Sequence, residues 1–283
     1  KNADLLIVRS MTRIDEQLLG NSTVKFVGSA TAGLDHVDQS FLRERGIQFA
    51  SAPGANADSV VEYVFAALAE LSIRFQTRFV DKTIGIVGCG NVGSRLADRC
   101  RMLGMRVIEN DPPRGEREKG FVELNELLRR SDIVSVHTPL TSEGPHATRG
   151  LIGEAQLDLM KEGSWLIQSS RGGVCDEAAM LHARETNRIG ALVLDVWEGE
   201  PSVNGLHISK ADIATGHIAG YSIDAKKKGV QMVLDGARRA LGLPMTHHQD
   251  PTGLPLRKHV SSGSELNEAF RHLYDIRDDD QRF

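Results

Sequence analysis

This sequence of 283 residues has few cysteines, no long apolar run and little net charge. Its three cysteines, Cys89, Cys100 and Cys175, have no CxxC spacing, which disfavours a disulfide framework or a zinc site and suits a reducing compartment. No histidine adjoins Cys175 in the sequence to activate it, so we interpret this thiol as a small core residue rather than a nucleophile. We therefore expect no bound metal.

Charge and hydropathy exclude further classes of function. The formal net charge is −4, so the chain has no basic field to attract nucleic acid or an anionic membrane. The three consecutive lysines at 226–228 are the one basic run, which we interpret as a solvated helix face. No apolar stretch reaches the ~18–20 residues that cross a bilayer, and no signal-peptide pattern opens the sequence. We expect a cytoplasmic protein with no nucleic-acid or membrane partner.

Short β-branched runs alternate with helical patterns along the chain, which is typical of parallel α/β units. Most of the runs are continuously apolar, so we predict strands buried on both faces. The length also favours two cores, because single cores stop growing at roughly 250–300 residues. Strands are predicted at 5–8, 24–27, 47–50, 84–87, 106–108, 133–136, 165–167, 192–194 and 213–215, with helices at 57–74, 223–241 and 265–274.

A glycine-rich motif follows the fourth predicted strand. The strand leads into Gly88-Cys89-Gly90-Asn91-Val92-Gly93 and then into a helical run. In this strand–turn–helix context the GxGxxG pattern predicts a dinucleotide site. Gly88 makes the tight turn, Gly90 lets the backbone approach the pyrophosphate and Gly93 permits close packing of the helix on the strand. The helix N-terminus then offers free N–H groups to the phosphates.

An acidic residue follows the next strand. Asp111 comes after Gly93 at close to the ~20 residues expected for the acid that binds the adenosine ribose. A carboxylate there repels a 2′-phosphate, so we predict NAD rather than NADP as the cofactor. Arg114 keeps NADP open as an alternative, because it can accommodate a phosphate if Asp111 turns away.

Three residues that suit proton and hydride chemistry follow successive later strands. Arg171, Glu200 and His217 all lie at the carboxyl edge of the predicted sheet, where ligands bind in open α/β folds. Oxidation of a 2-hydroxy acid requires a base for the hydroxyl proton, and a histidine oriented by a carboxylate can supply it. An arginine can hold the substrate carboxylate with two parallel hydrogen bonds.

Other residues compete for these roles. His137 also ends a predicted strand, but no acid lies beside it in the sequence, so we interpret it as a wall of the nicotinamide site or a packed residue. Glu198 competes with Glu200 for the histidine. We expect Asp195 to contact the nicotinamide end of the cofactor rather than to orient the base.

With these motifs the chain resembles the D-isomer-specific 2-hydroxyacid dehydrogenases from about residue 4 to residue 245. The likeness is carried by the GxGxxG turn, Arg171-Gly172, Asp195-Val196, Glu200-Pro201 and Gly216-His217. It implies that His217 donates and accepts the proton, with Glu200 and Arg171 as its catalytic partners, and that the protein is a homodimer. It also implies substrate contacts from Ser10, Thr31 and Tyr221 and NAD contacts from Asp111, Thr138, Asp195 and Gly220.

The resemblance further implies a substrate that carries a phosphate, and the residues support part of this. Arg9 and Ser10 end a strand of the first domain, where a cation and a hydroxyl can bind one. Tyr221 follows His217 by a few residues and offers a phenolic hydroxyl. We therefore predict a small phosphorylated 2-hydroxy acid as the partner. Two alternatives stay open, namely another member of the family and a regulatory module that senses NAD without turnover.

Together these patterns predict an α/β protein with two doubly wound parallel-sheet domains around a cleft that closes on a hinge. One is a Rossmann-type NAD domain and the other a flavodoxin-like substrate domain. Members of the family usually have a further strand and helix before residue 4 and a longer dimerisation domain, so we expect a fragment. The expected ranges are 1–78 for the first part of the substrate domain, 79–221 for the NAD domain, 222–245 for a return helix and 246–283 for part of a dimerisation region.

Overall fold

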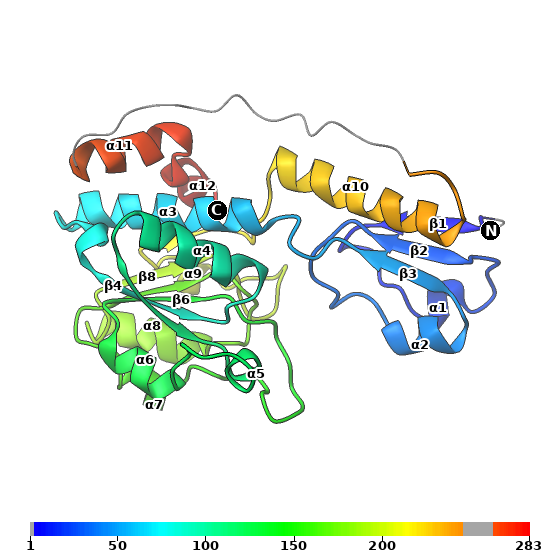
Figure 1. The fold of residues 1–283 in the computed structure, drawn as a ribbon. Helices are drawn as coiled ribbons and strands as arrows, with labels where there is room; N and C mark the ends of the chain where they lie inside the picture. Colours follow the sequence, from blue (N-terminus) through cyan, green and yellow to red (C-terminus); the bar gives the residue numbers. More distant parts are fainter. Residues whose placement is uncertain (1–2, 246–262) are drawn as a thin grey trace. The chain divides into compact units, whose positions relative to one another are not determined.

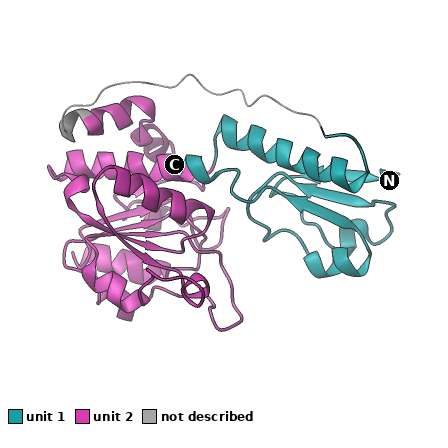
Figure 2. Cartoon of the chain, viewed as in Figure 1, with its two compact units in different colours: residues 1–59, 221–258 teal, residues 60–220, 259–283 magenta. Residues whose placement is uncertain are grey.

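The computed structural model describes residues 3–245 and 263–283, which form two compact units (Figure 1). Unit 1 holds the described residues of 1–59 and 221–258, and unit 2 those of 60–220 and 259–283 (Figure 2). The chain passes from unit 1 to unit 2 inside α3 (Ala57–Arg74) rather than at residues 78 and 79. The reason is that Val61, Val64 and Leu68 of this helix are buried in the core of unit 2.

Unit 1 is a three-stranded parallel sheet in the order β1-β2-β3. Alternate side chains of a strand face opposite layers, so Phe26 packs under one helix while Val27 packs under two others. No reversal of strand order, the feature that defines a flavodoxin-like sheet, occurs among the described residues of this unit. The elements are β1 (Leu5–Val8), α1 (Glu16–Leu19), β2 (Phe26–Ser29), α2 (Gln39–Glu44), β3 (Gln48–Ser51) and α10 (Ile223–Ala240).

Helix α10 lies close against the sheet of unit 1 because glycines leave room for it (Figure 1). A Cβ atom at Gly28 would lie 2.2 Å from Cγ1 of Val233, and one at Gly236 would lie 2.4 Å from Cβ of Ala50. The N-terminus of α10 is capped by Ser222, whose hydroxyl accepts from the N–H of Ala225 at 3.0 Å. The helix predicted at 223–241 is confirmed. Its apolar side packs on the strands formed by the first part of the chain.

Unit 2 is a six-stranded parallel sheet in the order β5-β4-β6-β7-β8-β9. The chain starts in β4, places β5 on one side and continues with β6 on the other, so the order reverses at β4. In such sheets the ligand site lies outside the carboxyl ends of the strands at this reversal. The strands are β4 (Thr83–Val87), β5 (Arg106–Asn110), β6 (Ile133–Val136), β7 (Trp165–Gln168), β8 (Ala191–Leu194) and β9 (Ile213–Ala214).

Helices cover both faces of this sheet, as continuously buried strands require (Figure 1). One core forms between the sheet and α3 and α4, and the other between the sheet and α6, α7 and α8. None of the helices in the described ranges is long and apolar enough to cross a membrane. The remaining elements are η1 (Phe79–Asp81), α4 (Asn91–Met102), α5 (Pro112–Gly115), α6 (Leu124–Arg130), α7 (Glu154–Leu157), α8 (Glu177–Glu185), α9 (Gly205–Ile208), α11 (Gly263–Leu273) and α12 (Ile276–Arg282).

The last two helices pack on unit 2. The ring of Phe270 stacks on that of Phe65 in α3 with centroids 5.2 Å apart, and the buried carboxylate of Glu70 accepts from the guanidinium of Arg271. In α12, Asp280 accepts from the N–H of Ala214 in the edge strand β9 at 2.7 Å. Within the region 246–283 that we expected to serve dimerisation, residues 246–262 lie outside the described residues, and α11 and α12 bury apolar side chains against α3.

Candidate active site

The glycine-rich turn has the geometry that its sequence predicts. Gly88 has φ +87°, which a side chain rarely adopts. A Cβ at Gly93 would lie 2.0 Å from the carbonyl oxygen of Gly88, whereas a Cβ at Gly90 would meet no atom within 4 Å. Gly90 is the N-cap of α4 and offers no capping side chain, so the amides of Asn91 and Val92 begin the helix beside open space. The turn has room for a pyrophosphate and amides to bind it.

Asp111 lies directly against this turn. Its Oδ2 atom accepts from the N–H of Cys89 at 2.8 Å, and its Oδ1 atom accepts from the N–H of Arg114 at 3.1 Å. The carboxylate therefore caps α5 and holds the end of β5 to the glycine-rich turn. This is the position at which an acid binds the ribose of a dinucleotide.

Two hydroxyls at the adjoining strand ends fit a ligand. The Oγ1 atom of Thr138, after β6, and the Oγ atom of Ser169, after β7, are buried and have no hydrogen-bond partner among the described residues. Buried polar groups are nearly always hydrogen-bonded, so unpaired ones at a sheet's ligand edge point to a bound group. A Cβ at Gly88 would lie 2.8 Å from Cγ2 of Thr138, which places that side chain beside the turn. The residues present fit a dinucleotide.

His217 and Glu200 form a hydrogen-bonded pair. The Nδ1 atom of His217 lies 2.7 Å from Oε2 of Glu200, and the other carboxylate oxygen accepts from the N–H of Trp197 at 2.6 Å. The side chains of the pair are 43% and 29% exposed, so the imidazole keeps access to a ligand. Because Glu200 holds Nδ1, the Nε2 atom is the one left for a substrate.

The pair shifts both protonation equilibria. The hydrogen bond with Glu200 raises the pKa of His217 above its ordinary value, and burial opposes this only in part. Burial alone would raise the pKa of Glu200, but the hydrogen bonds with His217 and the N–H of Trp197 lower it. An imidazole paired with a permanent carboxylate is suited to take up a proton and return it.

Arg171 lies close to this pair. After the contacts already named, its positive charge further lowers the pKa of both Glu200 and His217. Its Nη1 atom donates to the carbonyl of Ser170 at 2.8 Å. A Cβ at Gly172 would lie 2.0 Å from the carbonyl oxygen of Trp197, so the backbone after Arg171 packs directly on the loop that carries Glu200. The structure thus brings together the guanidinium, carboxylate and imidazole that we predicted to form the catalytic set.

Asp195 is fully buried and holds the turn that bears His217. Its carboxylate accepts from the hydroxyl of Thr215 at 2.7 Å and from the N–H groups of Ile218 and Ala219 at 2.8 and 2.9 Å. Burial raises the pKa of Asp195 to about 6, although these hydrogen bonds oppose the shift. His217 itself has φ +57°, a conformation that this set of bonds stabilises. The contact of Asp195 with NAD stays a prediction, as does that of Gly220.

The rivals for the catalytic roles are placed differently. His137 bonds the hydroxyl of Ser135 through Nε2 at 2.9 Å, and burial lowers its pKa to about 4, which keeps it neutral. Glu198 does not pair with His217; its backbone N–H donates to Glu177 at 2.7 Å. Cys175 is buried, and burial raises its pKa far above the ordinary value, so it has no thiolate character. The geometry favours Glu200 and His217.

The residues expected to bind the substrate lie in unit 1. Thr31 shares a hydrogen bond with Ser29 at 2.7 Å, and Ser29 also bonds Nε2 of His36 at 2.8 Å, so these side chains form one network at the end of β2. Arg9 and Ser10 follow β1 and are exposed. The charge of Arg9 also lowers the pKa of Tyr221, after the larger effect of Lys226.

Lys226 completes a positive cluster in unit 1 that we call the cation cluster, made of Arg9, Tyr221 and Lys226. The ammonium nitrogen of Lys226 lies 3.5 Å from the centroid of the Tyr221 ring. An exposed phenol in contact with one cation and within the electrostatic range of another is a donor set that suits a phosphate. Our interpretation of the lysine run as a solvated face holds for Lys227 and Lys228, which are exposed, whereas Lys226 is half-buried and contacts the ring of Tyr221. The signal for this contact was its spacing, because Lys226 lies one helical turn beyond Ser222, the N-cap residue next to Tyr221.

Comparison with known proteins decides the family. The sequence profile described as D-isomer specific 2-hydroxyacid dehydrogenase, NAD binding domain, matches residues 68–219. The chain belongs to the D-isomer-specific 2-hydroxyacid dehydrogenase family. The match spans β4 to β9 and therefore covers the glycine-rich turn, Asp111 and the three residues predicted to be catalytic. Residues 68–219 form the NAD-binding domain of this family, and NAD is the cofactor that the domain binds.

Relatives within the family are similar over most of the chain. The erythronate-4-phosphate dehydrogenase of Salinibacter ruber is 48% identical over 246 residues, which cover 85% of this chain and 63% of that protein. That of Citrobacter koseri is 43% identical over 288 residues, covering 99% of this chain and 76% of the relative. The chain thus spans about two thirds to three quarters of the length of these family members.

Solved structures of the family share the fold. A D-lactate dehydrogenase from Aquifex aeolicus, complexed with NAD and lactic acid, is 27% identical with a TM-score of 0.70, and the match covers 86% of this chain and 84% of that one. A 3-phosphoglycerate dehydrogenase from Entamoeba histolytica with bound NAD is 26% identical with a TM-score of 0.70, covering 84% and 78%. Both support a Rossmann-type fold for unit 2.

Proposed function

We propose that the chain belongs to an NAD-dependent dehydrogenase that oxidises 4-phospho-D-erythronate to 3-hydroxy-2-oxo-4-phosphooxybutanoate in vitamin B6 biosynthesis. The observation that carries the chemistry is the 2.7 Å bond between His217 and Glu200 at the strand ends of the NAD-binding unit. The choice of substrate is supported by the curated relatives, which are erythronate-4-phosphate dehydrogenases at 43–48% identity.

The residues of unit 2 have distinct tasks in this proposal. The amides of the glycine-rich turn bind the pyrophosphate, Asp111 binds the adenosine ribose and Thr138 donates its unpaired hydroxyl. When bound, NAD supplies the acceptor for the hydride that leaves the substrate carbon. The protein provides the base, the orientation and the charge around that carbon.

His217 removes the hydroxyl proton through Nε2, because Nδ1 is held by Glu200. The carboxylate stabilises the imidazolium that forms, which is the same effect that raises the pKa of His217 in the resting protein. Arg171 holds the substrate carboxylate and stabilises the carbonyl that develops as the hydride leaves. In the reverse direction the imidazolium returns the proton to the same oxygen.

The cation cluster of unit 1 would bind the phosphate of the substrate. Arg9 offers a guanidinium, Lys226 an ammonium group and Tyr221 a phenolic hydroxyl, while Ser10 and Thr31 add hydroxyls. A small unphosphorylated acid needs no such set. This is the feature of the structure that favours a phosphorylated substrate over glycolate or lactate.

A panel of 2-hydroxy acids tests the proposal. NADH absorbance is followed with 4-phospho-D-erythronate, 3-phosphoglycerate, D-lactate and glycolate at equal concentration. The proposal expects the highest kcat/KM for 4-phospho-D-erythronate. Activity confined to the unphosphorylated acids would overturn the substrate assignment and leave the class of reaction standing, whereas tight NAD binding without any turnover would favour an NAD-sensing module.

We also propose that the protein is a cytoplasmic homodimer. The location is supported by three cysteines that are all free and buried, as in proteins of reducing compartments. The dimer is supported by resemblance to the family alone. Light scattering on the full-length protein tests it, and a mass equal to one chain at micromolar concentration would contradict it.

A further inference from the structure

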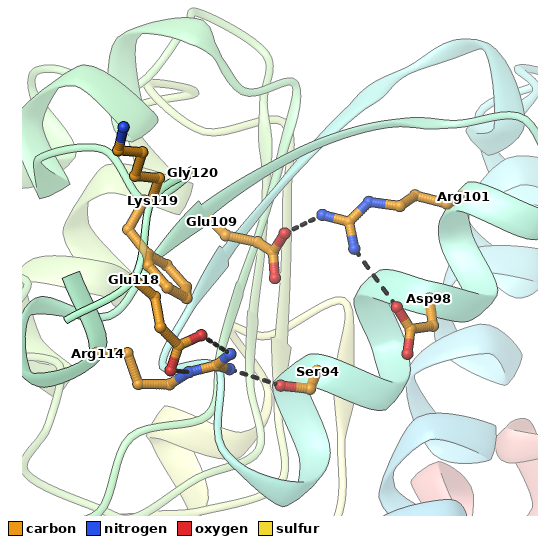
Figure 3. Close-up of a pocket in the computed structure, with 9 residues that line it drawn as sticks. Ser94, Asp98, Arg101, Glu109, Arg114, Glu118, Lys119 and Gly120 are labelled. Atoms are coloured by element: carbon orange, nitrogen blue, oxygen red, sulfur yellow. Dashed lines mark hydrogen bonds and ion pairs between the residues drawn. The ribbon is translucent and has the colours of Figure 1, made fainter.

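A surface cavity of about 410 Å³ adjoins the glycine-rich turn (Figure 3). It lies among α4, β5 and the segment after α5, and its lining includes Ser94, Arg101, Arg114 and Glu118. Both guanidinium groups of this lining are paired with carboxylates. Arg101 bonds Asp98 and Glu109 through separate nitrogens, and Arg114 bonds Glu118. With Lys119, the lining carries three basic side chains against three acidic ones, so its formal charges balance.

Arg114 is anchored to the glycine-rich turn. Its Nη1 atom donates to the carbonyl of Cys89 at 2.6 Å and to the hydroxyl of Ser94 at 2.9 Å, and its guanidinium carbon lies 4.9 Å from the ring centroid of Phe121. The backbone N–H of the same residue donates to Asp111. These contacts fix the guanidinium beside the carboxylate that we assign to the adenosine ribose.

The remaining edge of this guanidinium is occupied by Glu118. Nε donates to Oε1 at 3.0 Å and Nη2 donates to Oε2 at 2.5 Å, so the pair is bidentate. These are the two parallel donors with which arginine binds a phosphate. The side chains are 37% and 49% exposed, and exposed ion pairs contribute little to stability. The pair therefore contributes little to the stability of the fold, and we look for its role in ligand binding.

We propose that Glu118 is a specificity-determining residue that keeps Arg114 from binding the 2′-phosphate of NADP and so makes the chain select NAD. A 2′-phosphate approaching the ribose site would meet two carboxylates, Asp111 and Glu118, and a guanidinium whose two parallel donors are already engaged. The inference rests on the proposed function only in taking a nicotinamide dinucleotide as the ligand. It resolves the alternative that Arg114 left open in the sequence.

Nucleotide binding tests this without any turnover. NADH and NADPH are titrated at low ionic strength by their fluorescence into the wild type and the Glu118→Gln variant, which removes the charge and keeps the shape. We expect NADPH to bind about tenfold more tightly to the variant, the scale of one released charge-assisted contact. NADH affinity should change less than about twofold, and added salt should diminish the gain.

Two further variants make the test specific. Glu116→Gln makes the same change of charge two residues away, where the carboxylate bonds His146 instead of Arg114 at 2.8 Å. It should leave NADPH affinity unchanged. The double variant Glu118→Gln/Arg114→Gln should lose the gain, because the guanidinium that would bind the phosphate is gone. Displacement of NADPH by adenosine 2′,5′-bisphosphate should improve in Glu118→Gln, while displacement by AMP should not.

The outcomes separate this inference from the proposed function. Equal tightening in Glu118→Gln and Glu116→Gln, a gain that survives in the double variant, or unchanged NADPH affinity would overturn the role of Glu118 while NADH binding upholds the cofactor. A wild-type protein that binds neither nucleotide would overturn both. Preserved NADH affinity in each variant also reports that the unit is folded.

Discussion

Two turns of unit 2, at 88–93 and at 215–219, differ in whether their hydrogen-bonding groups are left for a ligand or used within the protein. The glycine-rich turn at 88–93 has no side chain at Gly88, Gly90 and Gly93, and no side-chain cap occupies the start of α4, so the N-terminus of that helix is open to a ligand. The turn at 215–219 is organised by the buried carboxylate of Asp195, whose acceptors are all used by the protein. The first turn is open to a ligand, whereas the second holds the backbone of His217 in place. We call the second turn, together with the side chain of Asp195, the mount. The comparison predicts that binding and catalysis can be broken separately.

Replacing His217 by Gln should have the largest effect. We expect kcat to fall by on the order of 10²–10⁴-fold, the usual contribution of a general base, while NADH affinity measured by fluorescence stays within about twofold. Glu198→Gln is the matched control, because that carboxylate lies in the same loop as Glu200 but does not pair with the imidazole. If kcat hardly changed in the histidine variant, the base would have to be sought elsewhere.

The glycine-rich turn should show the reverse pattern. Gly90→Ala adds a Cβ that meets no protein atom within 4 Å, so the melting temperature should hold while NADH affinity falls by at least about tenfold. Gly205→Ala, also in open space but remote from the turn, is its control. Gly93→Ala differs from both, because its Cβ would lie 2.0 Å from a backbone oxygen and should lower stability as well. Undiminished NADH binding in Gly90→Ala would remove the turn from the nucleotide site.

Asp195→Asn tests whether the second turn is a mount. The amide keeps one acceptor for Thr215 and Ile218 but faces the N–H of Ala219 with a donor, so one buried hydrogen bond is lost. We expect the free energy of unfolding to fall by about 1–3 kcal/mol and kcat to fall with it, measured by urea denaturation and NADH absorbance. A variant that loses NADH affinity but no stability would show that this carboxylate serves the cofactor instead.

The sequence predicted the first turn better than the second for a physical reason. The roles of Gly88, Gly90 and Gly93 follow from backbone geometry, which is local and can be derived from spacing alone. The mount depends on whether the side chain of Asp195 points inward or outward, and this is decided by contacts with β9 and the residues beyond it. Its task in the turn was therefore missed although its position in the sequence was clear.

The same contrast holds for the rest of the molecule. The strand ends that carry Arg171 and His217 could be predicted because parallel strands share an edge. Position alone left Glu198 as a rival of Glu200; only the family resemblance chose between them, and the loop geometry agrees with that choice. The strand predicted at 24–27 begins later, as β2 at Phe26–Ser29, since the pairing with β1 sets its limits. The helix predicted at 265–274 was found, but its packing on α3 depends on long-range contacts that periodicity does not report.

The pH dependence of kcat/KM tests the pairing of His217, in the turn at 215–219, with Glu200. Glu200 raises the pKa of His217, and oxidation of the hydroxy acid needs the neutral imidazole. The kcat/KM for oxidation should therefore rise with pH through this raised pKa. In Glu200→Gln the pKa drops, so the rise should move to lower pH while the maximal rate falls, because the imidazolium formed during the reaction is less stabilised. A profile that moved to higher pH would contradict the pairing.

Tyr63→Phe should have the smallest effect and probes how far the mount extends. The Tyr63 hydroxyl in α3 bonds that of Thr215 at 2.7 Å, and Thr215 in turn bonds Asp195. Because the phenol is buried, its loss should lower the free energy of unfolding by about 0.5–1.5 kcal/mol, measured by urea denaturation. In an Asp195→Asn background the further loss should be smaller, since the chain of hydrogen bonds is already broken. Additive losses would confine the mount to Asp195 and leave α3 as packing alone.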